Sequence, residues 1–427
     1  MTWNRPWEIL EQSRTNRFGS APPVMLTETE ALEHLLARVQ PGPAETTRLL
    51  DALGRFSTAD LLATLPLPGF DNSMMDGYAI QAAASADPSH LISVHAEQPA
   101  GIDLHLTCPP GKAVRIFTGA PMPAGADAVI MQEDVELVDD SIRCREPVQP
   151  GENVRRAGAD LCRGQVMLRR GEKMTAGIIG LLASQGLEKV EVHSAPRVAV
   201  LSTGDELRRP GQPLEDGCIF NSNGPMLQAL LAGLGIHEVR TAHCADDLEV
   251  TVSVLAELLA SQDVLLLSGG VSVGDHDHIK PALAKLGIRP EIWRIKVRPG
   301  KPFLFAQSRH DERSTSTSIF GLPGNPVSAF ITFHLFVRPA LLRWMGASDV
   351  SPFTLMAGVS GRLHNDGDRP HYLRGSLKDG VFQTTGLQQS HALYALSQAC
   401  ALLRLDPGQT LEAGDAARIL LLNTPTG

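Results

Sequence analysis

The stretch RVAVLS (197–202) is a continuous apolar run, typical of a strand that is buried on both faces of a sheet. DVLLLSGG (263–270) and SIFGLP (318–323) repeat this pattern. Helical stretches are predicted after the first of these runs, at about 223–234 and 246–260. Strands and helices that alternate at this spacing predict an α/β fold with a doubly wound, mostly parallel sheet.

Further strands of the same sheet are predicted in HEVRTAHC (237–244), EIWRIKV (291–297) and FLFA (303–306), with another helix after residue 277. The polar insert QSRHDERSTSTS (307–318) is expected to form a solvated loop between two strands.

The regions that flank the α/β part have a different character. Residues 28–39 have the apolar spacing of an amphipathic helix, with Thr27 as its N-cap. Short apolar runs between Pro/Gly clusters, such as AVRIF (113–117) and DAVIM (127–131), predict small β-rich domains. The predicted division is a 1–22 N-terminal extension, a connecting domain of 23–55 and 150–175, a β-rich domain at 56–149, an α/β domain at 176–345 and a C-terminal β-barrel-like domain at 346–427.

Composition excludes several classes of protein. The 427 residues are 43% hydrophobic and 20% charged, enough to build sizeable cores, and the net charge of −9 argues against a nucleic-acid-coating protein. The six cysteines form no CxxC pair, so neither a zinc ribbon nor a disulfide framework is predicted. The start lacks the apolar run of a secretory signal, and Gly and Pro interrupt the longest uncharged stretch (319–337). We therefore expect a soluble, cytoplasmic protein that spans no membrane.

Three loops follow predicted strands and are rich in small residues: STGDE (202–206), SGGVSVGD (268–275) and GLPGNP (321–326). Ligands of open α/β sheets bind at the carboxyl ends of the strands, where glycines let backbone N–H groups approach an anion. None of the loops is a Walker loop or a GxGxxG fingerprint, so ATPase and NAD-binding assignments are not favoured. Tight turns without a ligand are the alternative.

Acidic residues stand beside these loops, notably Glu206, Asp246 and Asp277. Carboxylates next to a phosphate cradle commonly hold Mg²⁺. The alternative is that they are helix N-caps, an objection that applies most to Asp246. The string DHDH (275–278) has no partner motif for zinc, and a solvated loop is the favoured interpretation.

Basic residues concentrate in RIKVR (294–298), followed by Lys301. Strand alternation would place the three cations on one face and the two apolar side chains on the other. Positive charge concentrated in an acidic protein indicates an anionic ligand, phosphate or another oxyanion, whereas a solvated face with surface ion pairs is the alternative.

Together these segments resemble the molybdopterin molybdenumtransferase (MoeA) family, which includes the E domain of gephyrin. The resemblance is collinear from about residue 25 to 422. The matching strings are PGFDNSMMDGYA (68–79), RIFTGAPMPAGADAVIMQED (115–134), GENVRRAGAD (151–160), AVLSTGDEL (199–207), DVLLLSGGVSVGDHD (263–277), VRPGKPF (297–303) and GLPGNPVSAF (321–330).

The resemblance implies the last step of molybdenum cofactor synthesis. Adenylylated molybdopterin and molybdate are the expected substrates: Mg²⁺ assists cleavage of the phosphoanhydride, AMP leaves, and molybdate is inserted at the dithiolene. The positions that match family catalytic residues are Asp76, Thr118, Asp160, Glu206 and Asp277, and the implied metal ligands are Glu206, Asp246 and Asp277. The implied substrate- and oxyanion-binding positions are Ser268, Gly269, Gly270, Arg294, Arg298, Lys301, Pro323, Pro326, Arg374 and Ser390.

The family also implies an elongated, homodimeric subunit whose first β domain reaches the α/β domain of its partner, so that Asp76 and Thr118 act across the interface. Expected partners are a molybdopterin adenylyltransferase and molybdoenzymes or their chaperones. Arg294 and Arg298 stand where lysine is common in the family, and arginine offers a planar fork in place of a point donor. Three alternatives stay open: the same chemistry with tungstate, a molybdopterin-binding scaffold or carrier, and a nucleotide-binding module without chemistry.

Overall fold

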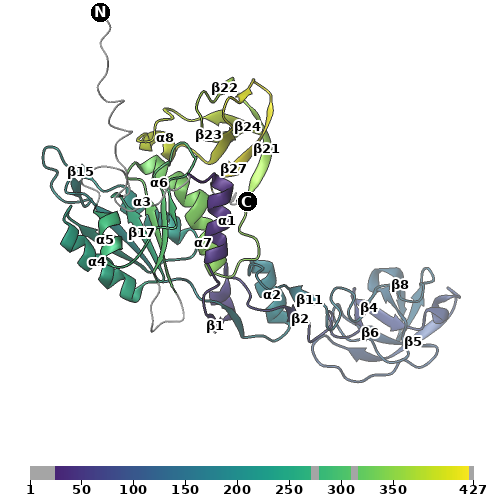
Figure 1. Cartoon of the computed structure of the whole chain (residues 1–427). Coiled ribbons are helices and arrows are strands. Elements are labelled where there is room, and N and C mark those ends of the chain that lie inside the picture. The colour runs from purple at the N-terminus through teal and green to yellow at the C-terminus, as the bar shows by residue number, and fades with distance from the viewer. Residues whose placement is uncertain (1–24, 271–277, 309–315, 423–427) are drawn as a thin grey trace, which may run out of the picture.

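The centre of the molecule is a six-stranded sheet (Figure 1). The structure is a computed structural model that describes residues 25–270, 278–308 and 316–422. The strand order is β16-β13-β17-β20-β19-β18; the first four strands are parallel to one another, and β19 pairs antiparallel with both of its neighbours, β20 and β18. The bounds are β13 (Val198–Thr203), β16 (Val239–Cys244), β17 (Val264–Ser268), β18 (Ile292–Trp293), β19 (Leu304–Ser308) and β20 (Thr317–Leu322). The predicted mostly parallel sheet is confirmed.

Both faces of this sheet are covered by helices. Val198 and Val200 of β13 pack into one hydrophobic core, and Ala199 and Leu201 pack into a second core on the opposite face. The first core includes side chains of α1 (Glu28–Arg38), α3 (Asn223–Ala232), α6 (Pro326–Thr332) and α7 (Arg338–Trp344); the second includes those of α4 (Leu248–Ser261) and α5 (Ile279–Lys285). The alternation of side chains along a strand therefore produces the doubly wound architecture.

Helix α1 begins as predicted. The Thr27 hydroxyl accepts a hydrogen bond from the Glu30 backbone N–H, and the Glu30 carboxylate accepts one from the Thr27 backbone N–H. This reciprocal pair is a capping box, which satisfies N–H groups that have no partner within the helix.

A second six-stranded sheet lies at the far end of the molecule from the central sheet (Figure 1), and we call it the β-domain sheet. Its order is β7-β4-β6-β5-β9-β8, with β4 (Gly77–Ile80), β5 (Leu91–Gln98), β6 (Lys112–Ile116), β7 (Ala128–Met131), β8 (Val135–Val138) and β9 (Ser141–Cys144). The predicted strands AVRIF and DAVIM are β6 and β7. The link to the centre contains the short pairs β1–β12 (Ala44–Arg48 with Lys189–His193) and β2–β11 (Leu61–Leu62 with Val166–Leu168), beside helix α2 (Ala176–Ser184). The subunit is elongated, as expected.

The C-terminal region is a closed barrel of β21 (Thr354–Val359), β24 (Val381–Thr384), β23 (His371–Lys378), β25 (Ala401–Leu405) and β27 (Ala416–Leu421). The Tyr372 hydroxyl and the Arg404 guanidinium, both on the barrel, reach the Glu28 carboxylate at 3.1 and 2.6 Å. Glu28 is the first residue of α1, so this network ties the barrel to the helix that packs on the central sheet.

Two local expectations differ from the structure. The strand predicted at 291–297 ends at Trp293, and Arg294 has a left-handed backbone (φ 71°), which breaks the strand. Ile295 and Val297 are still buried while Lys296 and Arg298 are exposed, so the burial pattern persists without strand pairing. The polar insert is also shorter than 307–318, because its ends belong to the buried strands β19 and β20. The N-terminal extension and residues 309–315 lie outside the described residues.

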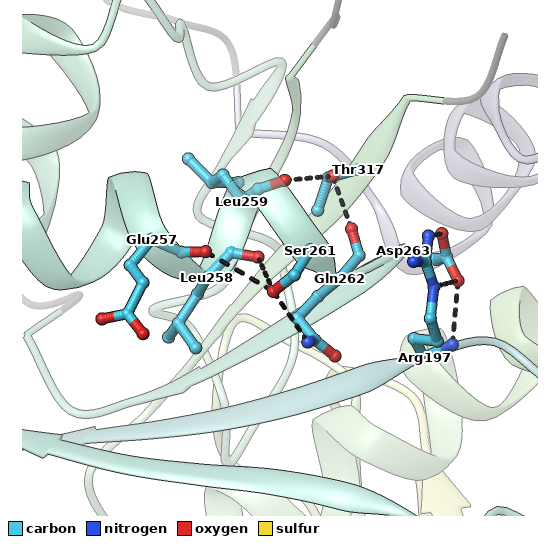
Figure 2. A network of polar contacts seen from close by, with 8 residues as sticks. All are labelled: Arg197, Glu257, Leu258, Leu259, Ser261, Gln262, Asp263 and Thr317. Atoms are coloured by element: carbon cyan, nitrogen blue, oxygen red, sulfur yellow. Dashed lines mark hydrogen bonds and ion pairs between the residues drawn. The ribbon is translucent and has the colours of Figure 1, made fainter. Parts of the chain in front are cut away.

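A polar network lies at the amino ends of the central strands (Figure 2). The Asp263 carboxylate accepts hydrogen bonds from the backbone N–H of Arg197 at 2.9 Å and from its guanidinium at 2.6 and 3.0 Å. The Thr317 hydroxyl lies 2.8 Å from the Gln262 carbonyl. These contacts fix the register of β13, β17 and β20 before the chain reaches the loops at the other end.

Candidate functional site

A cleft of about 750 Å³ lies at the carboxyl ends of β13, β17 and β20. The loops after β13 and β20 meet here with residues 268–270, the described part of the loop after β17, as the parallel order of the strands requires. The predicted site residues that line it are Glu206, Asp246, Ser268, Gly269, Gly270, Pro323 and Pro326.

Hydrogen bonds between loops shape the floor of the cleft. Asn223, at the start of α3, donates from Nδ2 to the Ser268 hydroxyl at 2.9 Å and to the Gly324 carbonyl at 2.8 Å. Its Oδ1 is buried without a partner. Asn221 donates to the Ser202 hydroxyl at 2.9 Å. The ends of all three strands are thereby held by two asparagines.

Gly270 illustrates why the loop after β17 needs glycine. Its φ is +64°, and a Cβ there would lie 2.7 Å from the Ile279 side chain. A side chain would therefore clash with the start of α5, whereas glycine lets the backbone itself form the cleft wall.

Two carboxylates line the described part of the cleft, Glu206 and Asp246, and both are exposed. The Asp205 carboxylate accepts a hydrogen bond from the Asp246 backbone N–H at 3.1 Å, which keeps the two loops together. The N-cap of α4 is Asp247, whose side chain accepts from Val250 N–H at 2.9 Å, so the Asp246 side chain is not the cap. Asp277 lies outside the described residues.

Glu206 and Asp246 suit an Mg²⁺ ion that is shared with a substrate better than a metal ion whose ligands all come from the protein. Within the described ranges, no three His, Cys, Asp or Glu side chains gather closely enough to hold an ion. Mg²⁺ is commonly bound through one or two carboxylates together with substrate phosphates and water. Glu206 and Asp246 fit that pattern.

A cluster of basic side chains forms where the α/β body meets the barrel. Arg374, on β23, is fully buried; it donates from Nη2 to the Leu387 carbonyl at 2.5 Å, and its Nε and Nη1 have no partner. Burial lowers the pKa of the Arg374 guanidinium from its usual range. A buried guanidinium with two unused donors is costly, and a bound oxyanion would supply both the charge and the acceptors.

The pKa of His371 reflects the positive charge of this cluster. Burial, followed by the charges of Arg298 and Arg374, lowers its pKa to about 4. The imidazole is therefore neutral at neutral pH, and the neighbouring cations lie close enough to oppose its protonation.

The other predicted oxyanion residues occupy different positions relative to the cleft. Lys301 and Ser390 directly adjoin Pro302 and His391, which line it. The Ser390 carbonyl accepts from the Val327 N–H at 3.2 Å, beside Pro326. Arg298 lies against the barrel through its Asp366 contact, and Arg294 does not line the cleft.

Asp76, Thr118 and Asp160 lie far from the cleft, towards the β-domain sheet. Asp76 accepts hydrogen bonds at one oxygen from the Thr118 backbone N–H and hydroxyl, at 2.7 and 2.9 Å. These bonds hold the pKa of the Asp76 carboxyl below its usual range. The structure brings Asp76 and Thr118 together, while the exposed Asp160 sits in the link, its N–H donating to the Leu67 carbonyl.

Sequence reasoning missed several cleft residues, among them Asn221, Asn223, Phe220 and His391. The string NSNG (221–224) carried a signal, because Asn, Ser and Gly favour turns and caps ahead of a helix. His391 offered none, because only the packing of the barrel brings it to the sheet.

The molybdopterin molybdenumtransferase of Nostoc sp. is 35% identical over 391 residues, covering 89% of this chain and 89% of that protein. The chain belongs to the MoeA family. It is an enzyme of molybdenum cofactor biosynthesis. The molybdopterin molybdenumtransferase of Haemophilus influenzae is 34% identical over 407 residues, covering 92% of this chain and 98% of that protein.

The family descriptions match the chain in order. The MoeA N-terminal region (domain I and II) matches 26–186, the probable molybdopterin binding domain 199–343, and the MoeA C-terminal region (domain IV) 357–422. A crystal structure of the molybdopterin biosynthesis MoeA protein from Pyrococcus horikoshii OT3 aligns with a TM-score of 0.80 at 27% identity, covering 93% of this chain and 100% of that one. The MoeA fold is thus confirmed, whereas the domain limits drawn from the sequence stay predictions.

Proposed function

We propose that this MoeA-family enzyme binds adenylylated molybdopterin in the cleft, cleaves its phosphoanhydride with Mg²⁺, releases AMP and transfers molybdate to the dithiolene. The residues in and beside the cleft support this proposal. Glycine-rich strand ends suit a phosphate and two carboxylates suit Mg²⁺. Lys301 directly precedes Pro302 of the cleft wall, whereas Arg374 lies on the barrel outside that wall.

The observation that carries the proposal is Arg374. Two donors of a fully buried guanidinium lack partners, which is rare unless a ligand completes them. A tetrahedral dianion matches both the charge and the forked geometry. Lys301, Ser390 and Arg298 would complete the molybdate site, with Arg294 supplying longer-range charge.

Glu206 and Asp246 would hold Mg²⁺, with Asp277 as a third ligand from outside the described residues. The bound ion would neutralise charge on the phosphoanhydride oxygens during cleavage. The N–H groups of Gly269 and Gly270 would orient the phosphates, Ser268 would support that loop, and Pro323 and Pro326 would fix its opposite wall.

The enzyme acts as a homodimer in which Asp76, Thr118 and Asp160 serve the cleft of the partner subunit. Two observations support this arrangement: the Asp76–Thr118 pair is exposed, and its domain extends away from its own cleft (Figure 1). The enzyme acts in the cytoplasm, between a molybdopterin adenylyltransferase that supplies the substrate and molybdoenzymes or chaperones that receive the product. No helix among the described residues has the length and apolar character to cross a bilayer.

The decisive experiment measures AMP release from adenylylated molybdopterin by the purified protein with Mg²⁺, with and without molybdate, and with tungstate in parallel. We expect molybdate-dependent release that Glu206→Gln abolishes; Glu257→Gln, a change of the same charge at an exposed site on α4, serves as the control. Release with tungstate alone would keep the chemistry and change the metal. Tight binding without release would indicate a carrier or scaffold.

Mixed dimers test the action across the interface. Asp76→Asn and Glu206→Gln homodimers are each expected to be inactive. Dimers that combine one subunit of each retain one intact composite site and recover about half of the wild-type activity. No recovery in verified mixed dimers would show that Asp76 serves the cleft of its own subunit, and an active Asp76→Asn homodimer would show that Asp76 has no catalytic role.

A further inference from the structure

The α/β body contacts the barrel at Arg298, and backbone hydrogen bonds join the two parts there. The Arg298 N–H donates to the Pro370 carbonyl at 2.9 Å, and the Tyr372 N–H donates to the Arg298 carbonyl at 2.8 Å. The guanidinium of Arg298 is therefore attached to a fixed backbone beside β23, the strand that carries Arg374.

The turn at 365–369 is also rigidly held, by Asn365. This side chain is fully buried and donates to the carbonyls of Arg369 and Leu405 at 2.9 and 3.1 Å, while its Oδ1 accepts from the Gly367 N–H at 3.1 Å. All the polar groups of the Asn365 amide therefore maintain the shape of the turn.

This turn brings the Asp366 carboxylate close to the Arg298 guanidinium. An oxygen of Asp366 lies 3.4 Å from Arg298 Nη1, and a Cβ on Gly367 would lie 3.3 Å from the same nitrogen. Both charged side chains are solvated, with 44% of Arg298 and 82% of Asp366 exposed. The nearby Arg374, in contrast, has no carboxylate partner.

We propose that Asp366 sets the oxyanion affinity of this site by occupying Arg298 in the free protein. The inference rests on the proposed function, because it takes Arg298 as part of the molybdate site. An incoming dianion must displace the Asp366 carboxylate or tolerate its repulsion, so part of the attraction of the basic cluster is cancelled. Asp366 thus weakens binding of an oxyanion that the remaining cations would otherwise hold more tightly.

The test compares wild type, Asp366→Asn and Asp379→Asn for molybdate binding by calorimetry and for molybdate-dependent AMP release. Asp379 lies in the β23–β24 turn with a positive φ that asparagine also tolerates, so it matches the charge change at another place on the barrel. Exposed ion pairs are weak, so we expect Asp366→Asn to lower the Kd and KM for molybdate by about two- to fivefold at low ionic strength. The gain shrinks at high salt, and Asp379→Asn resembles wild type.

A double-mutant cycle confirms the route of the effect. In an Arg298→Met background, Asp366→Asn is expected to change molybdate affinity far less, because both residues act through one contact. Unchanged or weaker binding in Asp366→Asn, or an equal gain in Asp379→Asn, would overturn the inference. Tighter molybdate binding without any AMP release would instead contradict the proposed function and leave the role of Asp366 standing.

Discussion

Thr118 donates two hydrogen bonds to the same oxygen of Asp76, from its backbone N–H at 2.7 Å and its hydroxyl at 2.9 Å. Both hydrogen bonds lower the pKa of the Asp76 carboxyl, and the bond from the backbone N–H has the larger effect. Thr118→Val removes only the hydroxyl, so we expect that pKa to rise part of the way towards its ordinary value. Carboxyl-carbon NMR titration measures the shift. Thr107→Val, elsewhere in the β-rich region, is the control, and an unaltered titration in Thr118→Val would contradict the account.

Substitution of Arg374 is expected to impair activity without lowering the stability of the fold. Arg374→Met removes a buried charge that has a single hydrogen bond, so thermal unfolding should occur at an equal or higher temperature. The KM for molybdate should rise at least about tenfold, equivalent to about 1.4 kcal/mol. Steady-state kinetics and calorimetric unfolding check the two effects, with the exposed Arg418→Met of β27 as control. A large loss of stability with normal KM would mean that Arg374 is structural.

Asp246 and Asp247 are adjacent, but the structure gives them different roles. Asp246→Ala should lower kcat and raise the Mg²⁺ requirement, because its carboxylate lines the cleft. Asp247→Ala should cost about 1 kcal/mol of unfolding free energy through loss of the α4 cap, with kcat preserved. Mg²⁺ titrations of AMP release and urea denaturation separate them. The reverse assignment would follow if Asp247→Ala were the variant that needs more Mg²⁺.

The network at the amino ends of the strands is expected to matter for stability alone. Asp263 is almost buried and accepts three hydrogen bonds from Arg197, so Asp263→Ala should cost about 2–3 kcal/mol of unfolding free energy. Molybdate KM should stay unchanged, because Asp263 precedes β17 whereas the cleft lies at the other end of that strand. Glu257→Ala removes an exposed ion pair with Arg240 and should cost less than about 1 kcal/mol. Equal losses in the two variants would refute this distinction.

The buried His334 is expected to make the stability of the folded protein depend on pH. Burial, followed by the charge of Arg338, lowers the pKa of His334 to about 3. Because this value is below that of an unfolded histidine, about 6.5, protonation favours the unfolded chain. Its contribution to stability is complete above pH 6.5 and is lost as the pH falls towards 3.

The measurement is Tm between pH 7 and pH 4 for wild type and His334→Phe, a substitution suited to the aromatic contact with Phe330. We expect the variant to lose less stability on acidification, with the remaining slope due partly to His371. His90→Gln, at an exposed position, should behave like wild type. An identical slope in His334→Phe would show that this histidine is not the group responsible.

The sequence alone determined the local structure around the site. Apolar runs such as RVAVLS are typical of strands buried on both faces, and the glycines that follow them allow the backbone to line a ligand cleft. Thr27 and Glu30 specified the start of α1 because a capping box depends on residues three positions apart. The motif strings likewise indicated the family.

Only the tertiary structure decided which side chains share a site and what each one lacks. The family resemblance pointed to Arg374, but only the structure shows that its guanidinium is enclosed with unused donors. Asp366 had no signal in the sequence, and the structure places its carboxylate beside Arg298. Likewise, Glu28 meets Arg404 across 376 positions of the chain. Such contacts follow from the packing of the barrel against the central sheet, and the burial and charge neutralisation of these side chains depend on that packing. No periodicity along the chain predicts them.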